Sequence, residues 1–353
     1  MIRQKRPTQQ YKLLQKEYDD VYKDIMLNGY DFSGPYTERC QEKLKEITGR
    51  KHMYMTISGT GAITAAIYAL DLFDKKVAVG SWNYSACVNQ YQAFSKPVFV
   101  DCDDNFFIDI EKIPSDCDAV MLVNYFGNVV DYDKLASVYK GKVVADCSQA
   151  LGATYKGRTD GYFGDVSTFA FGGQKPLGTR GFAGAIGTDD DDIAYRIDCV
   201  INQGKAGENR NNKTEMLGFR GTPQELQCGM LYVGMKHYKE WQEKRKKIAT
   251  QIQDELSDCP LRFIKTNYCD SGYFKLPFEL DNRDKFIAFM HEQGVDAQVT
   301  FLDDWNVVFG DGTPMPNTQK MISNTATLPL SPFFSDEEVT TIIEAVKKFY
   351  KQG

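Results

Sequence analysis

Short apolar runs recur along the first half of the chain, and segments of helical periodicity separate them. Several of the runs are continuously apolar rather than alternating, which is typical of strands covered on both faces of a sheet. They are "HMYMTIS" (52–58), "KVAVGS" (76–81), "KPVFVDCD" (96–103), "AVMLVNYF" (119–126), "KVVADCS" (142–148), "VSTFAF" (166–171) and "GAIGT" (184–188). Between them, residues 61–73 and 131–140 carry helical spacing. The alternation predicts an α/β fold with a mostly parallel central sheet.

The pattern changes after about residue 223. A helical pattern that begins at Pro223, a residue favourable in a first turn, continues to Leu256 and is long enough to bridge two domains. Strand-like runs at 261–265 and 272–280, a helix at 283–294 and a final helix follow. Ser335 and Glu338 form a capping box at the start of that last helix. We therefore predict a large α/β domain over residues 1–235, with an N-terminal arm, and a smaller α+β domain over 236–353.

Composition narrows the class of protein. The chain has 353 residues and a net charge of −6, and its densest basic run, "KEWQEKRKK" (239–247), interleaves glutamates. This argues against a nucleic-acid partner, which normally requires a clustered basic surface. Neither a signal peptide nor a run of roughly 20 apolar residues is present, so no membrane partner is expected. The nine cysteines lack metal-ligand spacing. We expect reduced thiols, no metal and a soluble cytoplasmic protein.

One lysine stands apart from the solvated ones. Lys175 lies in "FAFGGQKPLGTRGFAG" (169–184), between an apolar strand and a glycine-rich loop. A P-loop is excluded because Gln174 precedes and Pro176 follows the lysine, and no dinucleotide fingerprint has the required order. The remaining chemistry is attack of the amine on a carbonyl, and pyridoxal phosphate (PLP) is the common cofactor of that kind. PLP also requires a carboxylate for its ring nitrogen, an aromatic face and an anion site for its phosphate.

Candidates for these three partners lie upstream. Asp146 stands at the carboxyl end of a predicted strand, where open α/β sheets place ligand-binding groups. Gly59 and Thr60 join a strand to a helix and could bind phosphate with backbone N–H groups. Trp82 follows the next strand and could stack on the ring. Taken singly, each residue also suits a turn, a helix start or a core position.

Blocks of the sequence resemble the DegT/StrS-type PLP-dependent sugar aminotransferases. They keep their order from about residue 32 to Phe349: "SGTGAITAAIYAL", "KPVFVDCDDNFFIDIEKI", "VVADCSQALGATYKGRTDGYFGDVSTFAFGGQK", "LGFRGTPQELQCGML" and "TATLPLSPFFSDEEVTTIIEAVKKF". The resemblance implies a fold type I PLP-dependent transferase, a homodimer whose active sites lie at the subunit interface. It also implies roles for the residues above: Lys175 bonds to the cofactor, Asp146 pairs with its pyridinium nitrogen, and Trp82 stacks on its ring. Gly59 and Thr60 hold the phosphate, and Gln149 lies near the phenolic oxygen.

The chain departs from the family pattern at four places. Ala170 replaces the usual serine five residues before the lysine, and Arg220 stands where an asparagine usually reaches the partner subunit's cofactor phosphate. A guanidinium binds phosphate well, so Arg220 could offset the missing hydroxyl. The loop after Lys175 is one residue longer than the common pattern, and "FLDDWNVVFG" replaces the usual histidine region. Both of these last segments face the substrate in the family.

The resemblance implies a transaminase of amino-sugar biosynthesis. We expect L-glutamate as the amino donor and a nucleotide-linked 3- or 4-keto-6-deoxy sugar as the acceptor, with Lys205 and Arg180 as candidates for contacts to substrate charges. A PLP-dependent sugar dehydratase is the nearest alternative, although such enzymes carry histidine in place of Lys175. Two further alternatives are an acceptor without a nucleotide, such as a cyclitol ketone, and a non-catalytic PLP-binding regulator.

Overall fold

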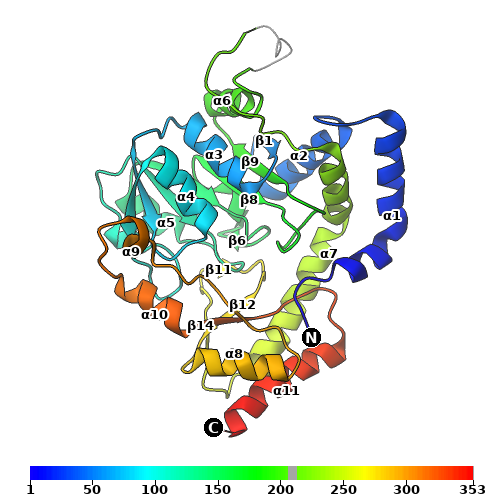
Figure 1. Ribbon diagram of the computed structural model, residues 1–353, viewed down its shortest axis with the longest axis vertical. Helices are drawn as coiled ribbons and strands as arrows, with labels where there is room; N and C mark the ends of the chain where they lie inside the picture. Colours follow the sequence, from blue (N-terminus) through cyan, green and yellow to red (C-terminus); the bar gives the residue numbers. More distant parts are fainter. Residues whose placement is uncertain (206–212, 353) are drawn as a thin grey trace.

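The computed structural model describes residues 1–205 and 213–352, and its larger part is built on a seven-stranded sheet (Figure 1). The strand order is β1-β9-β8-β5-β4-β2-β3. Bounds are β1 His52–Thr56, β2 Lys76–Gly80, β3 Lys96–Val100, β4 Ala119–Val123, β5 Lys142–Asp146, β8 Val166–Ala170 and β9 Gly184–Thr188. Neighbours from β8 to β3 are parallel, whereas β9 is antiparallel to both β8 and β1. The predicted α/β fold with a mostly parallel sheet is confirmed.

Helices surround this sheet because its strands are apolar on both faces. Every residue of β4 is buried, and α3 packs on β8 and β9. The helices of this part are α1 Pro7–Asn28, α2 Pro35–Thr48, α3 Gly59–Ala69, α4 Ser85–Phe94, α5 Tyr132–Val138 and α6 Asp191–Ile201, with short 3-10 turns at Ile110–Lys112 and Asp160–Tyr162. A small sheet joins β6 Thr154–Tyr155, β7 Arg158–Thr159 and β11 Cys269–Asp270.

The C-terminal part has its own antiparallel sheet, in the order β10-β12-β14-β13. Its elements are β10 Arg262–Phe263, β12 Leu276–Glu279, α8 Arg283–Glu292, β13 Gln298–Val299, β14 Thr325–Leu328 and α11 Asp336–Gln352. The predicted capping box of α11 is present, because Ser335 and Glu338 exchange hydrogen bonds of 3.1 and 3.2 Å. Two helices, α9 Trp305–Phe309 and α10 Pro316–Asn324, return to the large sheet, where the Ser81 hydroxyl donates to Asp304 at 2.6 Å.

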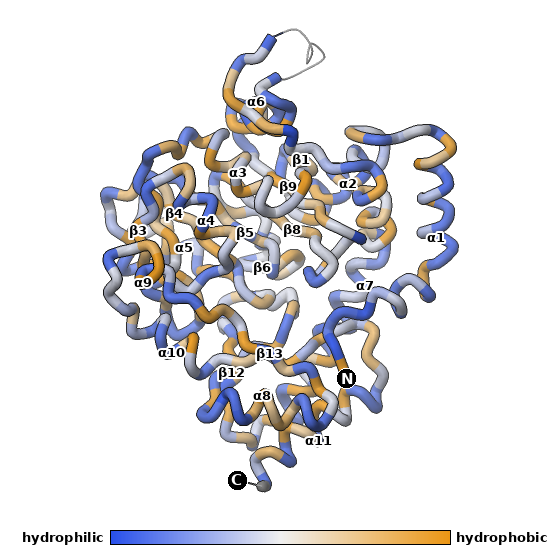
Figure 2. Tube along the Cα trace, in the orientation of Figure 1, coloured by the Kyte–Doolittle hydropathy of each residue, from blue (hydrophilic) through white to orange (hydrophobic). Residues whose placement is uncertain are grey.

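The long helix α7 (Glu225–Glu255) connects the two parts. Apolar residues alternate with polar ones along it (Figure 2), and its buried residues change from the large core at Trp241 to the small core at Ala249. The predicted domain boundary at 235/236 falls inside this helix and stays a prediction. Pro223 lies before the N-cap residue Gln224, so its predicted place in the first turn is wrong.

One buried carboxylate ties α7 to α2. Glu225 has no exposed surface and accepts hydrogen bonds from the backbone N–H groups of Gly34, Tyr36 and Thr37 at 2.8–2.9 Å. The hydroxyl of Thr37 donates to the same carboxylate. Because these donors belong to the first turn of α2 and the residue before it, Glu225 caps that helix from another element.

The N-terminal arm, residues 1–6, crosses to the C-terminal part before α1 begins. Ile2 forms a parallel bridge with Val295, and its N–H donates to the Gly294 carbonyl at 2.6 Å. Arg6 pairs with Glu338 at 2.6 Å. The arm passes beside the loop that follows β8, where the Lys5 Nζ lies 3.3 Å from the place that a Cβ on Gly173 would occupy.

Candidate active site

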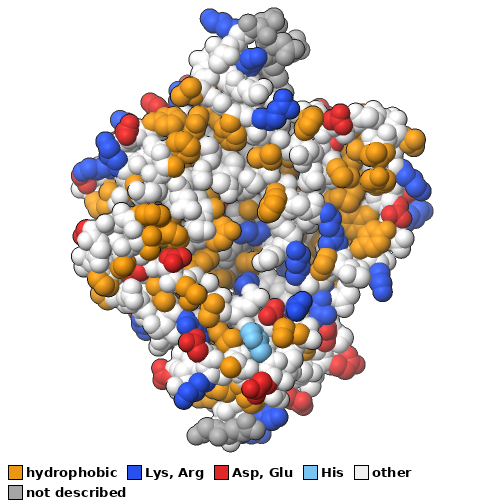
Figure 3. All heavy atoms as spheres, viewed as in Figure 1, with side chains coloured by type: hydrophobic (Ala, Val, Ile, Leu, Met, Phe, Trp, Pro, Cys, Tyr) orange, Lys and Arg blue, Asp and Glu red, His pale blue; other side chains and the backbone are white. Residues whose placement is uncertain are grey.

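The site lies where the carboxyl ends of neighbouring strands meet. Asp146 is the last residue of β5, and Lys175 follows β8, the parallel neighbour of β5. Parallel strands end at the same edge of a sheet, so these two residues share one edge. Figure 3 shows a hollow between the two parts of the molecule, with Lys and Arg side chains in it and around it.

Lys175 is held in a turn and is half-buried. Its backbone N–H donates to the Gly172 carbonyl at 2.9 Å, and its Nζ lies 5.9 Å from the ring centroid of Tyr84 and 6.0 Å from that of Phe274. Burial lowers the pKa of the Lys175 amine, while the charges of Asp146 and Cys87 act in the opposite direction. A lowered pKa favours the neutral amine, which is the nucleophilic and basic form.

Asp146 is oriented by two donors. The Ser148 N–H donates to its Oδ1 at 2.9 Å, and the thiol of Cys87 approaches its Oδ2 at 3.3 Å. Burial, and then the charge of Asp146, raises the pKa of the Cys87 thiol well above its ordinary value, so Cys87 stays a donor. The carboxylate is thus fixed at the sheet edge, and its charge acts on the Lys175 amine.

An anion cradle begins helix α3. The hydroxyl of Ser58 caps the helix by accepting from the Gly61 N–H at 3.0 Å. The N–H groups of Gly59 and Thr60, in the first turn, have no acceptor within the helix and form part of the positive end of its dipole. A Cβ at Gly59 would lie 2.5 Å from the Cβ of Ala170, so only glycine fits there. Position 170 therefore touches the cradle, and Ala170 presents a methyl group to it.

The structure brings Tyr84, and not Trp82, to the amine. Trp82 is 1% exposed, stacks on Phe106 at 5.0 Å and 17°, and donates from Nε1 to the Phe301 carbonyl at 3.3 Å. Its ring has no face left for another ring, which corrects the expectation that it stacks on a cofactor. Tyr84, the N-cap residue of α4, is 52% exposed and faces Lys175. The sequence signal missed was the second aromatic of "SWNYSA" (81–86), which directly precedes a helix.

The other predicted residues lie at different distances from this centre. Gln149 is buried, and its Oε1 accepts from the Phe126 N–H at 3.2 Å. Arg220 is exposed, and its guanidinium carbon lies 5.6 Å from the Phe32 ring, while the next residue, Gly221, binds the Ile57 N–H just before the cradle. Its expected contact to a partner subunit lies beyond a single chain and stays a prediction.

The two candidates for substrate charges differ in their surroundings. Arg180 is exposed and donates to the Pro7 carbonyl at 2.6 Å, on the rim of a pocket that Lys175 also lines. Lys205 is half-buried and borders residues 206–212, which lie outside the described part of the chain. The structure does not bring Lys205 to the lysine amine by any contact among the described residues.

Sequence reasoning also missed Lys275. Its Nζ lies 5.8 Å from the centroid of the Phe274 ring that Lys175 approaches, and it donates to Gln298 Oε1 at 3.0 Å. Burial, and then the charge of Lys175, lowers the pKa of Lys275 to about 8. The available signal was one lysine inside the apolar run "GYFKLPFEL" (272–280).

Residues 1–205 and 213–352 lack two kinds of feature. No cluster of three or more His, Cys, Asp and Glu side chains there is arranged to hold a metal ion. Within the same residues, no helix has the length and apolar character needed to cross a membrane.

Comparison with known proteins gives matches along nearly the whole chain. The model of the DegT/DnrJ/EryC1/StrS aminotransferase family matches residues 13–347. A dTDP-3-amino-3,6-dideoxy-alpha-D-galactopyranose transaminase from Aneurinibacillus thermoaerophilus is 27% identical over 95% of this chain and 96% of its own. A pleiotropic regulatory protein from Geobacillus stearothermophilus is 25% identical over 98% of this chain and 97% of its own.

The fold has solved counterparts. The crystal structure of NtdA from Bacillus subtilis, with bound cofactor PMP, aligns with a TM-score of 0.87 at 24% identity, over 95% of this chain and 82% of NtdA. The alignment shows the same α/β architecture in both parts of the chain.

Proposed function

The chain belongs to the DegT/DnrJ/EryC1/StrS aminotransferase family, and we propose that it transfers an amino group from L-glutamate to the carbonyl of a keto sugar with PLP as cofactor. The observation that carries the proposal is the Lys175 amine, which shares one sheet edge with the fixed carboxylate of Asp146.

The residues present fit this cofactor. Lys175 would bond to its aldehyde, Asp146 would pair with the ring nitrogen, and Tyr84 would cover the ring in place of Trp82. The N–H groups of Gly59 and Thr60 would hold the phosphate, as helix N-termini do. When bound, PLP withdraws electrons from the amino donor and so weakens its Cα–H bond.

The chain's own residues supply the rest of the chemistry. The amine of Lys175, when free, would accept the proton from the donor's Cα and deliver it to the cofactor carbon that carried the aldehyde. Ser148 and Cys87 hold the Asp146 carboxylate in one orientation, so its charge stays directed at the ring nitrogen.

For the acceptor we propose a nucleotide-linked 3- or 4-keto-6-deoxy sugar. Support comes from a cavity of about 310 Å³ beside the lysine loop, whose lining includes Arg3, Lys5 and Lys275 and a single carboxylate, Asp296. Phosphoryl groups are well matched by such cations. The related transaminase named for a dTDP-linked amino sugar points to the same class.

We also propose that the enzyme works as a cytoplasmic homodimer with shared active sites. The described surface exposes large apolar side chains in the loop after Lys175 and in the segment before α7, among them Phe182 at 74% and Leu217 at 72%. Burial of such side chains against a second subunit would support an interface. Nine free cysteines suit a reducing compartment.

The purified protein tests the function by its colour. We expect a yellow protein that bleaches when L-glutamate is added and regains its absorbance when a suitable keto sugar follows. A Lys175→Ala variant should fold and still bind PLP reversibly, but it should not bleach. A panel of nucleotide-linked and free keto sugars, cyclitol ketones included, identifies the acceptor. A chromophore that ignores every amino donor would instead favour the regulatory role that the name of one relative describes.

A further inference from the structure

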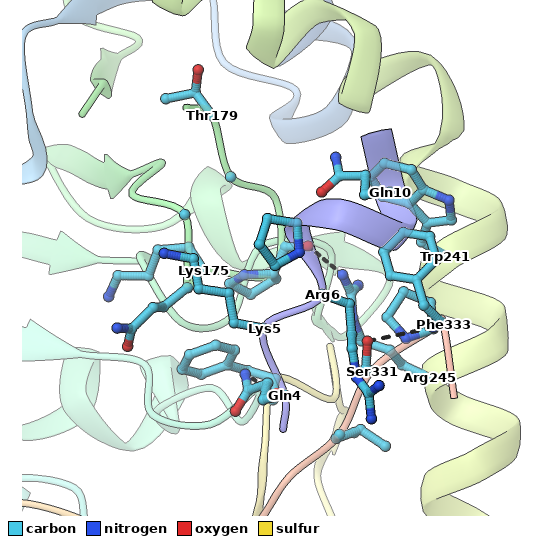
Figure 4. A pocket seen from close by; sticks show the side chains of 18 of the residues that line it. Gln4, Lys5, Arg6, Gln10, Lys175, Thr179, Trp241, Arg245, Ser331 and Phe333 are labelled. Atoms are coloured by element: carbon cyan, nitrogen blue, oxygen red, sulfur yellow. Dashed lines mark hydrogen bonds between the residues drawn. The ribbon is translucent and has the colours of Figure 1, made fainter. Parts of the chain in front are cut away.

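A small pocket lies behind the lysine loop. Its volume is about 60 Å³, and its walls are the N-terminal arm, residues 173–180, helix α7 and residues 330–333 (Figure 4). Five cationic side chains and, among the described residues, no carboxylate line it: Lys5, Arg6, Lys175, Arg180 and Arg245. Arg6 pairs with Glu338 at 2.6 Å, and the remaining excess of positive charge favours an anionic ligand.

Arg245 is the strongest sign of such a ligand. It is 6% exposed, its Nη2 donates to the Pro176 carbonyl, and its Nη1 has no hydrogen-bond partner among the described residues. Figure 4 shows the side chain among the residues around the pocket. Burial lowers the pKa of its guanidinium to about 10. Leaving a buried N–H unsatisfied costs about 1–3 kcal/mol, so an acceptor is expected to bind there.

Lys5 is the second cation with spare donors. Arg6 is engaged by Glu338, and Arg180 donates to Pro7. Lys5 forms no ion pair within the described part of the chain, and its Nζ lies 3.3 Å from the place a Cβ on Gly173 would occupy. Its ammonium therefore lies directly on the loop that carries Lys175.

We propose that Arg245 and Lys5 bind the side-chain carboxylate of the dicarboxylic amino donor in this pocket. The volume suits one carboxylate group, and a guanidinium is the preferred partner of a planar carboxylate. Lys175 lines the pocket, and the donor's amine would take the place of its amine on the cofactor. The larger cavity, which shares Gln4 and Lys5 with the pocket, remains for the acceptor. The proposal rests on the proposed aminotransferase function.

Glutarate, a dicarboxylate without an amine, tests binding directly. Calorimetric titration of the full-length holoenzyme should show binding to the wild-type protein. We expect the affinity for glutarate to fall at least about tenfold in Lys5→Gln and in Arg245→Gln, because each substitution removes a charge-assisted hydrogen bond. Lys12→Gln and Lys247→Gln, exposed lysines without contacts to the pocket, serve as matched controls. Lys5→Gln alters an arm residue outside the core and so keeps the test independent of folding. Unchanged glutarate affinity in both variants would overturn the proposal.

Donor choice gives a second readout. In the wild-type enzyme, bleaching should saturate at a lower concentration of L-glutamate than of L-glutamine, which lacks the side-chain carboxylate. Lys5→Gln should reduce this preference about tenfold through the half-saturating concentration, with the limiting rate little changed. A loss confined to the acceptor half-reaction would show that the pocket binds a phosphoryl group of the acceptor and would contradict the proposal. If the wild-type chromophore responds to no donor, the proposed function fails, and the glutarate titration alone decides the pocket.

Discussion

Two aromatic residues of one short segment, Trp82 and Tyr84, have different expected effects because one is enclosed and the other faces the amine. Tyr84→Ala should weaken PLP binding about fivefold, as expected for loss of ring stacking of about 1 kcal/mol, and leave the stability of the apoprotein unchanged. Trp82→Ala should lower the free energy of unfolding by about 3–5 kcal/mol through the cavity it creates. Absorbance titration with PLP and urea unfolding measure the two effects. If Trp82→Ala instead lost as much PLP affinity as Tyr84→Ala and kept its stability, Trp82 would be the residue that stacks on the cofactor ring.

Lys275 predicts a pH dependence of acceptor binding. Its pKa of about 8 lies below that of an ordinary lysine, so its positive charge is present below that pH and is lost as the pH rises through it. The affinity for an anionic acceptor should therefore fall between pH 7 and 9. Lys275→Gln should raise the acceptor KM several-fold at pH 7 and flatten the profile. Lys265→Gln, an exposed lysine of the same part of the molecule, should match the wild-type profile.

At the scale of elements, Glu225 is expected to hold α2 and α7 together. Its carboxylate accepts three backbone N–H groups and the hydroxyl of Thr37 at the start of α2. Glu225→Ala should lower the free energy of unfolding by about 3 kcal/mol, because several buried donors lose their acceptor at once. Urea unfolding measures this change. Glu243→Ala, at an exposed position of the same helix, should change stability by less than about 0.5 kcal/mol.

The sequence predicted the positions of most strands in the chain, but it did not predict two short helices of the C-terminal half. The seven apolar runs of the first half of the chain became the strands of the large sheet, and the inner strand β4 is buried along its whole length. The short helices α9 and α10 were not predicted, because their place depends on contacts such as Asp304 with Ser81. Register and direction of β9 likewise depend on its neighbours β8 and β1.

At the scale of the whole molecule, Arg220 links the cradle to the proposed dimer. If its guanidinium reaches the partner subunit's phosphate group, Arg220→Ala should weaken PLP binding about tenfold. Adding Ala170→Ser should recover part of that affinity, because position 170 touches Gly59 in the cradle. Light scattering coupled to size exclusion checks that both variants keep the oligomeric state of the wild type. Full PLP affinity in the single variant would contradict the role of Arg220.

Local pattern alone determined the strands, the capping box of α11 and the position of Lys175 after an apolar strand, because each depends on residues close together in the chain. Asp146 could be placed at the same sheet edge as Lys175 because the carboxyl ends of parallel strands lie at one edge of the sheet. Only the tertiary structure decided that Trp82 is enclosed, that Lys275 adjoins the Phe274 ring and that the N-terminal arm lies on the lysine loop. Burial and charge at these positions are set by segments far apart in the sequence, and no local pattern encodes such contacts.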